Sequence, residues 1–182
     1  MHALVVGGTG MLMPVVKQLI DDGYMVSVIA SLSSSLQALS SYLSSQASNL
    51  NALAVDYHDE DRLQQVLLEA IRTHGPITST VAWIHSSASA APLVIAELVT
   101  GDFFHLRSAS VSQPDFQDPF DVISIKALAD IDYYQIILGF VLENSAARWL
   151  TNQEIAQGVI AAMKEAKANW TIGTTAPWQS RP

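Results

Sequence analysis

The spacing of apolar positions changes at a glycine-rich turn near the start of the chain. Residues 3–6 form an unbroken apolar run, residues 7–10 read Gly-Gly-Thr-Gly, and residues 11–20 carry apolar side chains at helical spacing. A second apolar run occupies residues 25–30. This order predicts a strand, a tight turn, a helix and a second strand parallel to the first.

Strand-like and helix-like patterns continue to alternate through residue 106. Short connections between parallel strands favour right-handed crossovers, so the pattern predicts an α/β fold with a three-layer, doubly wound, mostly parallel Rossmann-like sheet. Asp59 is placed to cap one of the helices, and Gly75 ends it. The predicted elements are a serine-rich helix over residues 32–43, strands at 50–55, 80–84 and 103–106, and helices at 60–73 and 92–99.

The last third of the chain has a less regular pattern. Residues 113–120 contain two prolines and are predicted as a loop, residues 121–130 as a short helix, and residues 131–142 as one long strand. A capping-box pattern at residues 151–154 begins a last helix over residues 152–167. The apolar tail is predicted to fold back or to contact a second subunit, which would make a homo-oligomer. We expect one domain over residues 1–182.

The glycine turn is a candidate phosphate site. A dinucleotide pyrophosphate must approach the backbone closely at the start of a helix, where a side chain would block it. The turn supplies two of the three glycines of the G-x-G-x-x-G fingerprint, with Met13 in the third place, which predicts a slightly displaced helix. A purely structural glycine turn is the alternative. The predicted cofactor contacts here are Gly7, Gly8, Thr9, Gly10, Met11 and Leu12.

Ligands of doubly wound sheets bind beyond the carboxyl ends of the strands. That rule selects the loops at residues 7–10, 30–35, 56–59, 85–90 and 107–112, which should converge on one crevice. NAD-binding proteins place an acidic residue on the ribose at the end of the second strand, but this chain has Ala30 and Ser31 there. Because nothing anionic would repel a 2′-phosphate, NADP is slightly preferred over NAD.

Composition and charge narrow the classes of partner. The net charge is -8 and the nine Lys and Arg residues are scattered, which argues against nucleic acid. No apolar run reaches the roughly 20 residues of a membrane span, and the chain enters its first strand without a leader-like segment, which predicts a cytoplasmic protein. The chain has no cysteine, so disulfides and Cys-type zinc sites are excluded, and no other metal-ligand spacing is present.

Several stretches resemble a small, atypical branch of the short-chain dehydrogenase/reductase superfamily. They are Ala-Leu-Val-Val-Gly-Gly-Thr-Gly-Met-Leu at 3–12, Asp-Tyr-His-Asp at 56–59, His-Gly-Pro-Ile at 74–77, Val-Ala-Trp-Ile-His-Ser-Ser at 81–87, Ile-Leu-Gly-Phe-Val at 137–141 and Arg-Trp-Leu-Thr at 148–151. The resemblance implies a dinucleotide-binding Rossmann-like domain. It implies that Asp56, with Tyr57 beside it, lies near the adenine, and that His85 and Ser86 lie near the cofactor ribose or nicotinamide.

The chain departs from that superfamily at its usual catalytic motif. Tyr-x-x-x-Lys pairs a tyrosine with a lysine that lowers the pKa of its hydroxyl, and none of the lysines here follows a tyrosine at that spacing. Only Ser108 or Ser110 matches, by position, the superfamily serine that hydrogen-bonds the substrate. The usual mechanism therefore cannot be transferred to this chain.

Other polar residues have a structural and a chemical interpretation. His85 could be an acid or base in place of the missing tyrosine, but a histidine that shapes the cofactor loop is the favoured interpretation. His105, inside an apolar strand, is predicted to be a hydrogen-bonded core residue. Tyr133 and Tyr134 should point to opposite faces of a strand and serve packing. No G-x-S-x-G motif indicates a serine hydrolase.

The leading hypothesis is an NAD(P)-binding, short-chain-dehydrogenase-like protein. In this hypothesis it is an oxidoreductase for an unknown small carbonyl or alcohol, with His85, Ser108 and Ser110 as the catalytic candidates. A non-catalytic dinucleotide sensor with the same fold is the first alternative, because the Tyr-Lys pair is absent. A structural or interaction domain with a vestigial pocket is the second.

Overall fold

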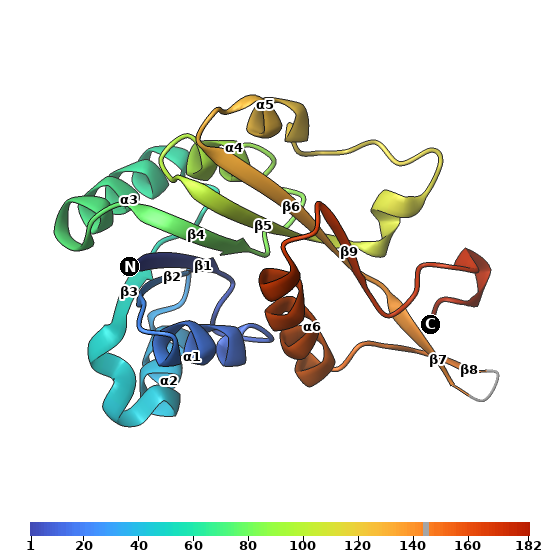
Figure 1. Ribbon diagram of the computed structural model, residues 1–182, viewed down its shortest axis with the longest axis horizontal. Coiled ribbons are helices and arrows are strands. Elements are labelled where there is room, and N and C mark those ends of the chain that lie inside the picture. The colour runs from blue at the N-terminus through green and yellow to red at the C-terminus, as the bar shows by residue number, and fades with distance from the viewer. Residues whose placement is uncertain (144–145) are drawn as a thin grey trace.

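A computed structural model describes residues 1–143 and 146–182 and contains a seven-stranded, fully parallel sheet (Figure 1). The strand order is β3-β2-β1-β4-β5-β6-β9. β1 lies near the centre, and the chain moves outward from it first in one direction and then in the other. The strands are β1 (His2–Val6), β2 (Met25–Ala30), β3 (Leu50–Ala54), β4 (Ile77–Ala82), β5 (Gly101–Ser108), β6 (Ile131–Leu138) and β9 (Asn169–Ile172).

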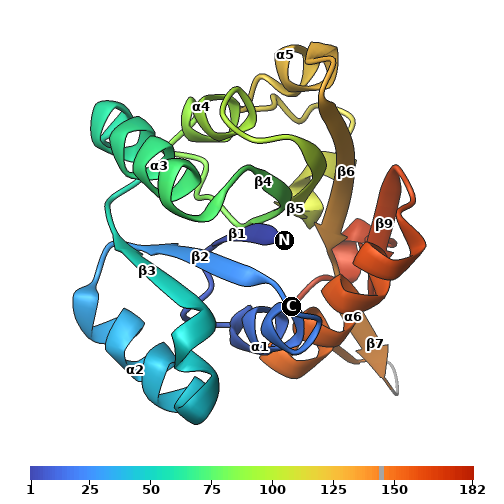
Figure 2. The ribbon, with the colours of Figure 1, turned by 60° about the vertical axis from the view of Figure 1, so that its left-hand side comes forward.

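Helices cover both faces of this sheet (Figures 1 and 2). Side chains of β1 alternate between two separate cores, Ala3 and Val5 facing one and Leu4 and Val6 the other. The first core is closed by α1 (Met13–Asp21), α2 (Ser33–Leu43) and α6 (Asn152–Glu165), and the second by α3 (Glu60–His74), α4 (Ala91–Ala96) and α5 (Val122–Ala127). The predicted single-domain, three-layer, doubly wound fold is therefore confirmed.

Two predicted helix starts are confirmed in atomic detail. Asp59 caps α3 by accepting a hydrogen bond from the Arg62 N–H at 3.0 Å. At the start of α6, Thr151 accepts from the Glu154 N–H and the Glu154 carboxylate accepts from the Thr151 N–H, which completes the capping box. Within the described residues, no helix is both long enough and apolar enough to cross a membrane.

The single strand predicted over residues 131–142 is wrong. β6 ends at Leu138, and β7 (Phe140–Glu143) turns away to pair with β8 (Ala146–Trp149) in an antiparallel hairpin. Phe140 also exchanges two backbone hydrogen bonds with Thr174, at 2.9 and 2.8 Å. A side chain on Gly139 would collide with the Thr174 carbonyl, so glycine permits this crossing.

Of the two alternatives predicted for the C-terminal segment, folding back and contact with a second subunit, the structure shows the first: the segment adds β9 at the edge of the sheet beside β6. The pattern had not predicted this strand. Other boundaries also move: β4 begins at Ile77 and ends at Ala82 instead of spanning 80–84, α4 ends at Ala96 and not at 99, and β5 continues through Arg107 to Ser108. The short helix predicted within residues 121–130 is present as α5, capped by Asp121.

Candidate functional site

The glycine turn joins the carboxyl end of β1 to α1. Gly7 has a φ of +80°, a conformation that L side chains rarely adopt, and its N–H donates to the Ile29 carbonyl of β2 at 3.3 Å. A Cβ on Gly7 would lie 3.2 Å from the Trp83 carbonyl oxygen. The turn is thus held between the ends of β2 and β4 and requires glycine at its first position.

The other two glycines of the turn have different surroundings. A Cβ on Gly8 would lie 2.8 Å from Val28 and 3.0 Å from Val16, so this glycine lets α1 pack closely on the sheet. A Cβ on Gly10 would meet no atom within 4 Å. Gly8 is therefore needed by the fold, whereas the open space at Gly10 is available to a ligand.

The start of α1 also fits an anionic ligand. In the described structure no side chain caps this helix, and its first turn carries no acidic residue. Partial positive charge at a helix start attracts phosphate, particularly where side chains leave it uncovered. These features fit a dinucleotide pyrophosphate beside Gly10.

The loops after β3 and β4 are joined by a polar cluster. His58 bonds to Asp56 through Nδ1 at 2.7 Å and to Ser87 through Nε2 at 2.9 Å. His85 Nδ1 lies 2.8 Å from the same Ser87 hydroxyl, and the His85 N–H donates to the Tyr57 hydroxyl at 3.3 Å. Bonds from the His58 backbone and side chain lower the pKa of Asp56. The structure thus brings Asp56, Tyr57 and His85 together at the carboxyl ends of β3 and β4.

Sequence reasoning did not identify His58 and Ser87 in this cluster. The order Asp56, His58, Ser87 is that of a serine-hydrolase triad. However, Ser87 is shared by two histidines: its N–H donates to His85 Nδ1 at 3.2 Å, and its hydroxyl lies 2.8 Å from the same Nδ1 and 2.9 Å from His58 Nε2. The cluster thus links the loops after β3 and β4 through one hydroxyl that His58 and His85 share.

Two pockets meet at the carboxyl ends of β4, β5 and β6. They share Trp83, Ser108 and Ser110 as lining residues, so both predicted serines stand between them. The first, the tail-side pocket, has a volume of about 460 Å³ and is lined by Met11, Trp83, Ser108, Ala109, Ser110, Leu138, Gly139, Trp149, Leu150, Ile155, Trp178 and Arg181. The second, the arginine pocket, has a volume of about 340 Å³ and is lined by Trp83, Ile84, His85, Ser86, Leu106, Arg107, Ser108, Ser110, Val111, Phe116, Pro119 and Phe120.

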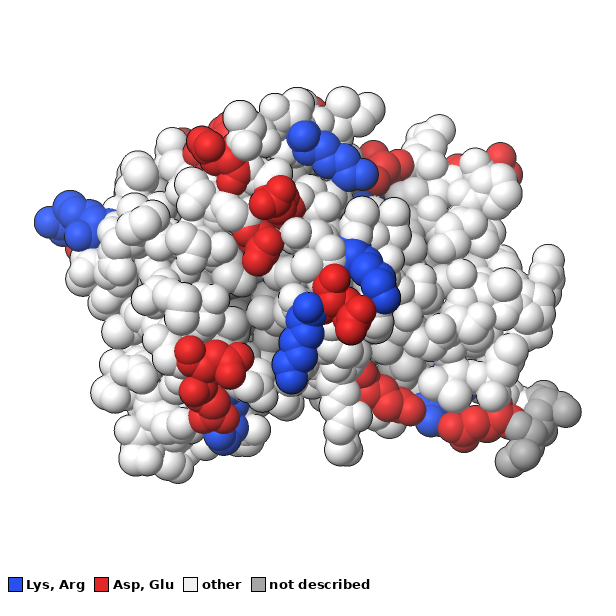
Figure 3. Space-filling view, in the orientation of Figure 1, with Lys and Arg blue, Asp and Glu red and all other residues white. Residues whose placement is uncertain are grey.

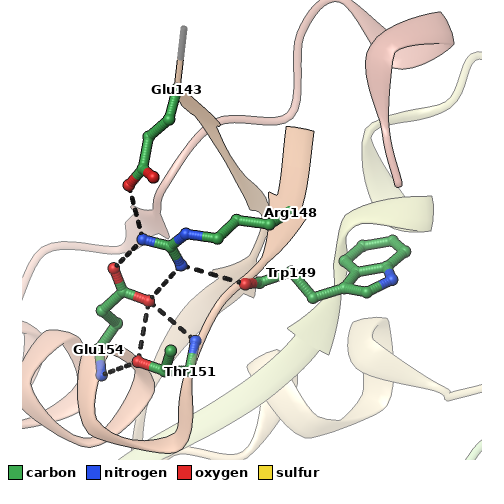
Figure 4. A network of polar contacts seen from close by, with 5 residues as sticks. All are labelled: Glu143, Arg148, Trp149, Thr151 and Glu154. Carbon is green, nitrogen blue, oxygen red and sulfur yellow. Dashed lines mark hydrogen bonds and ion pairs between the residues drawn. The ribbon is translucent and has the colours of Figure 1, made fainter. Parts of the chain in front are cut away.

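The β7-β8 hairpin holds Trp149 beside the tail-side pocket. Arg148 forms two hydrogen bonds of 2.9 Å with the carboxylate of Glu154 at the start of α6, and a third of 2.7 Å with Glu143 (Figure 4). Figure 4 shows the Trp149 indole on the side away from this network. The hairpin is thus tied to α6 while it presents an aromatic side chain to the pocket. In the sequence, residues 148–151 stand out only as part of the resemblance and indicate neither the hairpin nor its ion pairs.

Arg107 is the least expected residue of the site. Although predicted to lie in a loop, it belongs to β5, is only 2% exposed and pairs with Asp118 at 2.5 Å. Asp118 also accepts from the Phe120 N–H, and the guanidinium lies 5.0 Å from the centre of the Phe120 ring. The sequence signal was a single arginine directly after an apolar strand, which is also the pattern of a solvated strand end.

Elsewhere the charged residues give no indication of a metal or a polyanion. Among the described residues, no group of three His, Asp or Glu side chains could share a metal ion. On the face shown in Figure 3, Lys and Arg are scattered among Asp and Glu. The candidate site is therefore the edge of the sheet that carries the glycine turn, the polar cluster and the two pockets.

No protein-family model matches the sequence, and no curated protein sequence matches it at a significant level. Solved structures do match the fold. A short-chain dehydrogenase/reductase from Serratia marcescens has a TM-score of 0.70 and 16% identity, over 94% of this chain and 96% of that chain.

Two further solved structures with a similar fold contain a nicotinamide cofactor. A metagenomic short-chain oxidoreductase in complex with NADP has a TM-score of 0.66 and 14% identity, over 95% of each chain. A variant of actinorhodin polyketide ketoreductase with NADPH has a TM-score of 0.71 and 14% identity, over 94% of this chain and 95% of that chain. The chain therefore has the fold of short-chain dehydrogenases/reductases.

Proposed function

We propose that this protein binds NAD(P) along the carboxyl edge of its sheet and acts as an oxidoreductase on a small carbonyl compound or alcohol. One observation carries the proposal: Met11, directly after the glycine turn, lines the same pocket as Ser108 and Ser110. Met11, the residue that follows Gly10, and the two candidate substrate-binding serines thus line one cavity. The two matched folds described with NADP and NADPH support the class of cofactor.

In this proposal, different residues contact different parts of the cofactor. Gly10 and the start of α1 accommodate the pyrophosphate, while Asp56 and Tyr57 lie at the adenine end. Ala30 ends β2 and Ser31 follows it, and neither is acidic, which retains the slight preference for NADP. The bound cofactor would supply or accept the hydride.

Ser108 and Ser110 are assigned to the substrate. Their hydroxyls stand between the two pockets, where they can donate to a carbonyl oxygen and stabilise the negative charge that develops on it. His85 lines the arginine pocket, and its Nδ1 and N–H are both engaged within the polar cluster. We therefore assign His85 first to shaping the loop, and to proton transfer second.

The experiment is a titration with NAD⁺, NADH, NADP⁺ and NADPH, followed by melting temperature and tryptophan fluorescence. A ligand that binds the native state raises its stability, and three of the four tryptophans, Trp83, Trp149 and Trp178, line the tail-side pocket. We expect at least one form to raise the melting temperature and change the emission. No response to any form at millimolar concentration would disprove the proposal.

A non-catalytic dinucleotide sensor is the second candidate. It is favoured by the missing Tyr-x-x-x-Lys pair and by the engagement of His85 in loop contacts. If a cofactor binds, a panel of small aldehydes and ketones with NADPH or NADH separates the candidates. Oxidation of the reduced cofactor above a no-enzyme control supports the oxidoreductase, whereas binding without turnover across the panel supports the sensor.

A further inference from the structure

The arginine pocket contains a buried cation with a free donor. Arg107 is 2% exposed, and its Nη2 is engaged by Asp118. Its Nη1 is buried and has no hydrogen-bond partner among the described residues. The side chain lines a cavity of about 340 Å³, and Nη1 lies behind this lining, so an acceptor in the pocket reaches the donor once the neighbouring side chains shift.

A buried donor without a partner is costly to a protein. Burial removes the hydration of such a donor, and the free energy lost in this way is comparable to or larger than the net contribution of one ordinary hydrogen bond. The cost is larger still for a charged group. Asp118 compensates the charge of Arg107 on one side, and the Phe120 ring packs against the guanidinium. Neither residue satisfies Nη1, and the nearby Tyr133 hydroxyl is bonded to His105 Nδ1, so an oxygen acceptor that enters the pocket would supply the missing partner.

The position of this donor connects it with the proposed reaction. The arginine pocket shares Ser108 and Ser110 with the tail-side pocket, which is also lined by Met11, directly after the glycine turn. A molecule whose carbonyl faces these serines can therefore extend into the arginine pocket. The group it carries there would meet the Arg107 guanidinium.

We propose that Arg107 binds the carboxylate of the substrate, which is then an oxo acid or the corresponding hydroxy acid. This inference rests on the proposed oxidoreductase function. A carboxylate accepts strong hydrogen bonds from a guanidinium. The negative charge of Asp118, which contacts the same guanidinium, disfavours a phosphate dianion more than a carboxylate monoanion. The other titratable side chain lining this pocket is His85.

The experiment compares matched acids and esters. Pyruvate, acetoacetate and levulinate are tested against their methyl esters by the rise in melting temperature, in the presence and absence of NADPH. At least one acid should stabilise the protein while its ester does not. In the double variant Arg107→Gln/Asp118→Asn, which removes both charges together, Kd for that acid should rise about ten- to a hundredfold.

Two further variants complete the test. Arg72→Gln changes an exposed arginine of α3 and should retain the acid response of the wild type. Asp118→Asn removes only the competing carboxylate, so it should tighten binding of the acid. Equal stabilisation by acid and ester, or an acid response that the double variant retains, would overturn the inference.

The cofactor response separates this inference from the proposed function. The double variant should keep the NADPH-induced shift in melting temperature, because neither Arg107 nor Asp118 lines the tail-side pocket. Binding of an acid that depends on Arg107, without binding of any nicotinamide cofactor, would refute the oxidoreductase and leave a carboxylate-binding site. Binding of NADPH without discrimination between acid and ester would refute the carboxylate site alone.

Discussion

His105 and Tyr133 meet in the interior between two neighbouring strands, with His105 Nδ1 2.9 Å from the Tyr133 hydroxyl. His105 has no exposed surface, and burial lowers its pKa to about 3. Burial likewise raises the pKa of Tyr133 to about 12. Both side chains are therefore neutral near pH 7. The predicted core role of His105 is confirmed, although its Nε2 lacks a partner among the described residues.

The neutral His105 should make the protein sensitive to acid. In the unfolded chain histidine gains a proton near pH 6.5, whereas the folded protein resists protonation until about pH 3. Stability from this residue is complete above pH 6.5 and is lost as pH falls toward 3, by up to about 1.4 kcal/mol per pH unit. Urea unfolding at several pH values measures this loss.

The variant His105→Asn isolates this contribution. His2, whose pKa is also lowered mainly by burial, remains in both proteins and destabilises both in acid. The variant should start less stable at pH 7.5 and lose less stability between pH 6.5 and 4. Parallel curves for the two proteins would show that His105 does not drive the acid sensitivity.

Gly8 and Gly10 provide a matched pair of substitutions. Gly8→Ala should destabilise the protein by roughly 1–3 kcal/mol, because its Cβ would press on Val16 and Val28. Gly10→Ala should leave the melting temperature of the free protein nearly unchanged and weaken cofactor binding, since its Cβ points into open space. Thermal unfolding with and without NADPH measures both effects. Unchanged cofactor binding in Gly10→Ala would argue for a purely structural turn.

The sequence predicts most reliably those helices and strands in which one spacing of apolar residues persists along the whole element. β2 was predicted at its observed bounds, and Asp59 and Thr151 were recognised as helix caps because these signals act within four residues. Gly139 shows where such reasoning fails. β6 and β7 are both apolar, and the break between them is imposed by Thr174, which lies 35 positions later in the chain.

The candidate site shows the same division between local and distant determinants. The rule that ligands bind at carboxyl strand ends selected the loops of the glycine turn, Asp56, His85 and Ser108. It also selected residues 107–112, but it could not predict that Arg107 is buried, because an arginine after an apolar run is usually solvated. Its burial depends on Asp118 and Phe120, whose positions follow from the fold of an irregular loop.

Thr151 makes a prediction about the start of α6. Thr151→Ala removes the acceptor for the Glu154 N–H and should cost roughly 0.5–2 kcal/mol, whereas Thr151→Ser should retain most of the stability. Urea unfolding of the three proteins distinguishes the outcomes. Equal losses in both variants would indicate that the Thr151 methyl group, and not the cap, matters.

Arg148 should act through the same network. Hydrogen bonds to its carboxylate lower the pKa of Glu154 to about 2. The bonds from Arg148 have the largest effect, and those from the Thr151 N–H and hydroxyl come next. Stability from this carboxylate is present above about pH 4.5 and is lost as pH falls toward 2. Arg148→Gln should reduce that acid dependence and free the hairpin that carries Trp149, which a change in tryptophan emission would report. An unchanged acid limb of the stability profile would contradict this account.

The final prediction separates binding from catalysis at His85. Because its Nδ1 and N–H support the polar cluster, His85→Ala should weaken cofactor binding and change kcat at saturating cofactor by less than about tenfold. Ser87→Ala removes the partner of His85 Nδ1 and should have the same effect. In contrast, Ser108→Ala/Ser110→Ala should lower kcat about a hundredfold or more with little change in cofactor Kd. A loss of kcat of about a hundredfold or more in His85→Ala, with unchanged cofactor binding, would instead identify His85 as the proton donor, since the loop would then be intact while the chemistry failed.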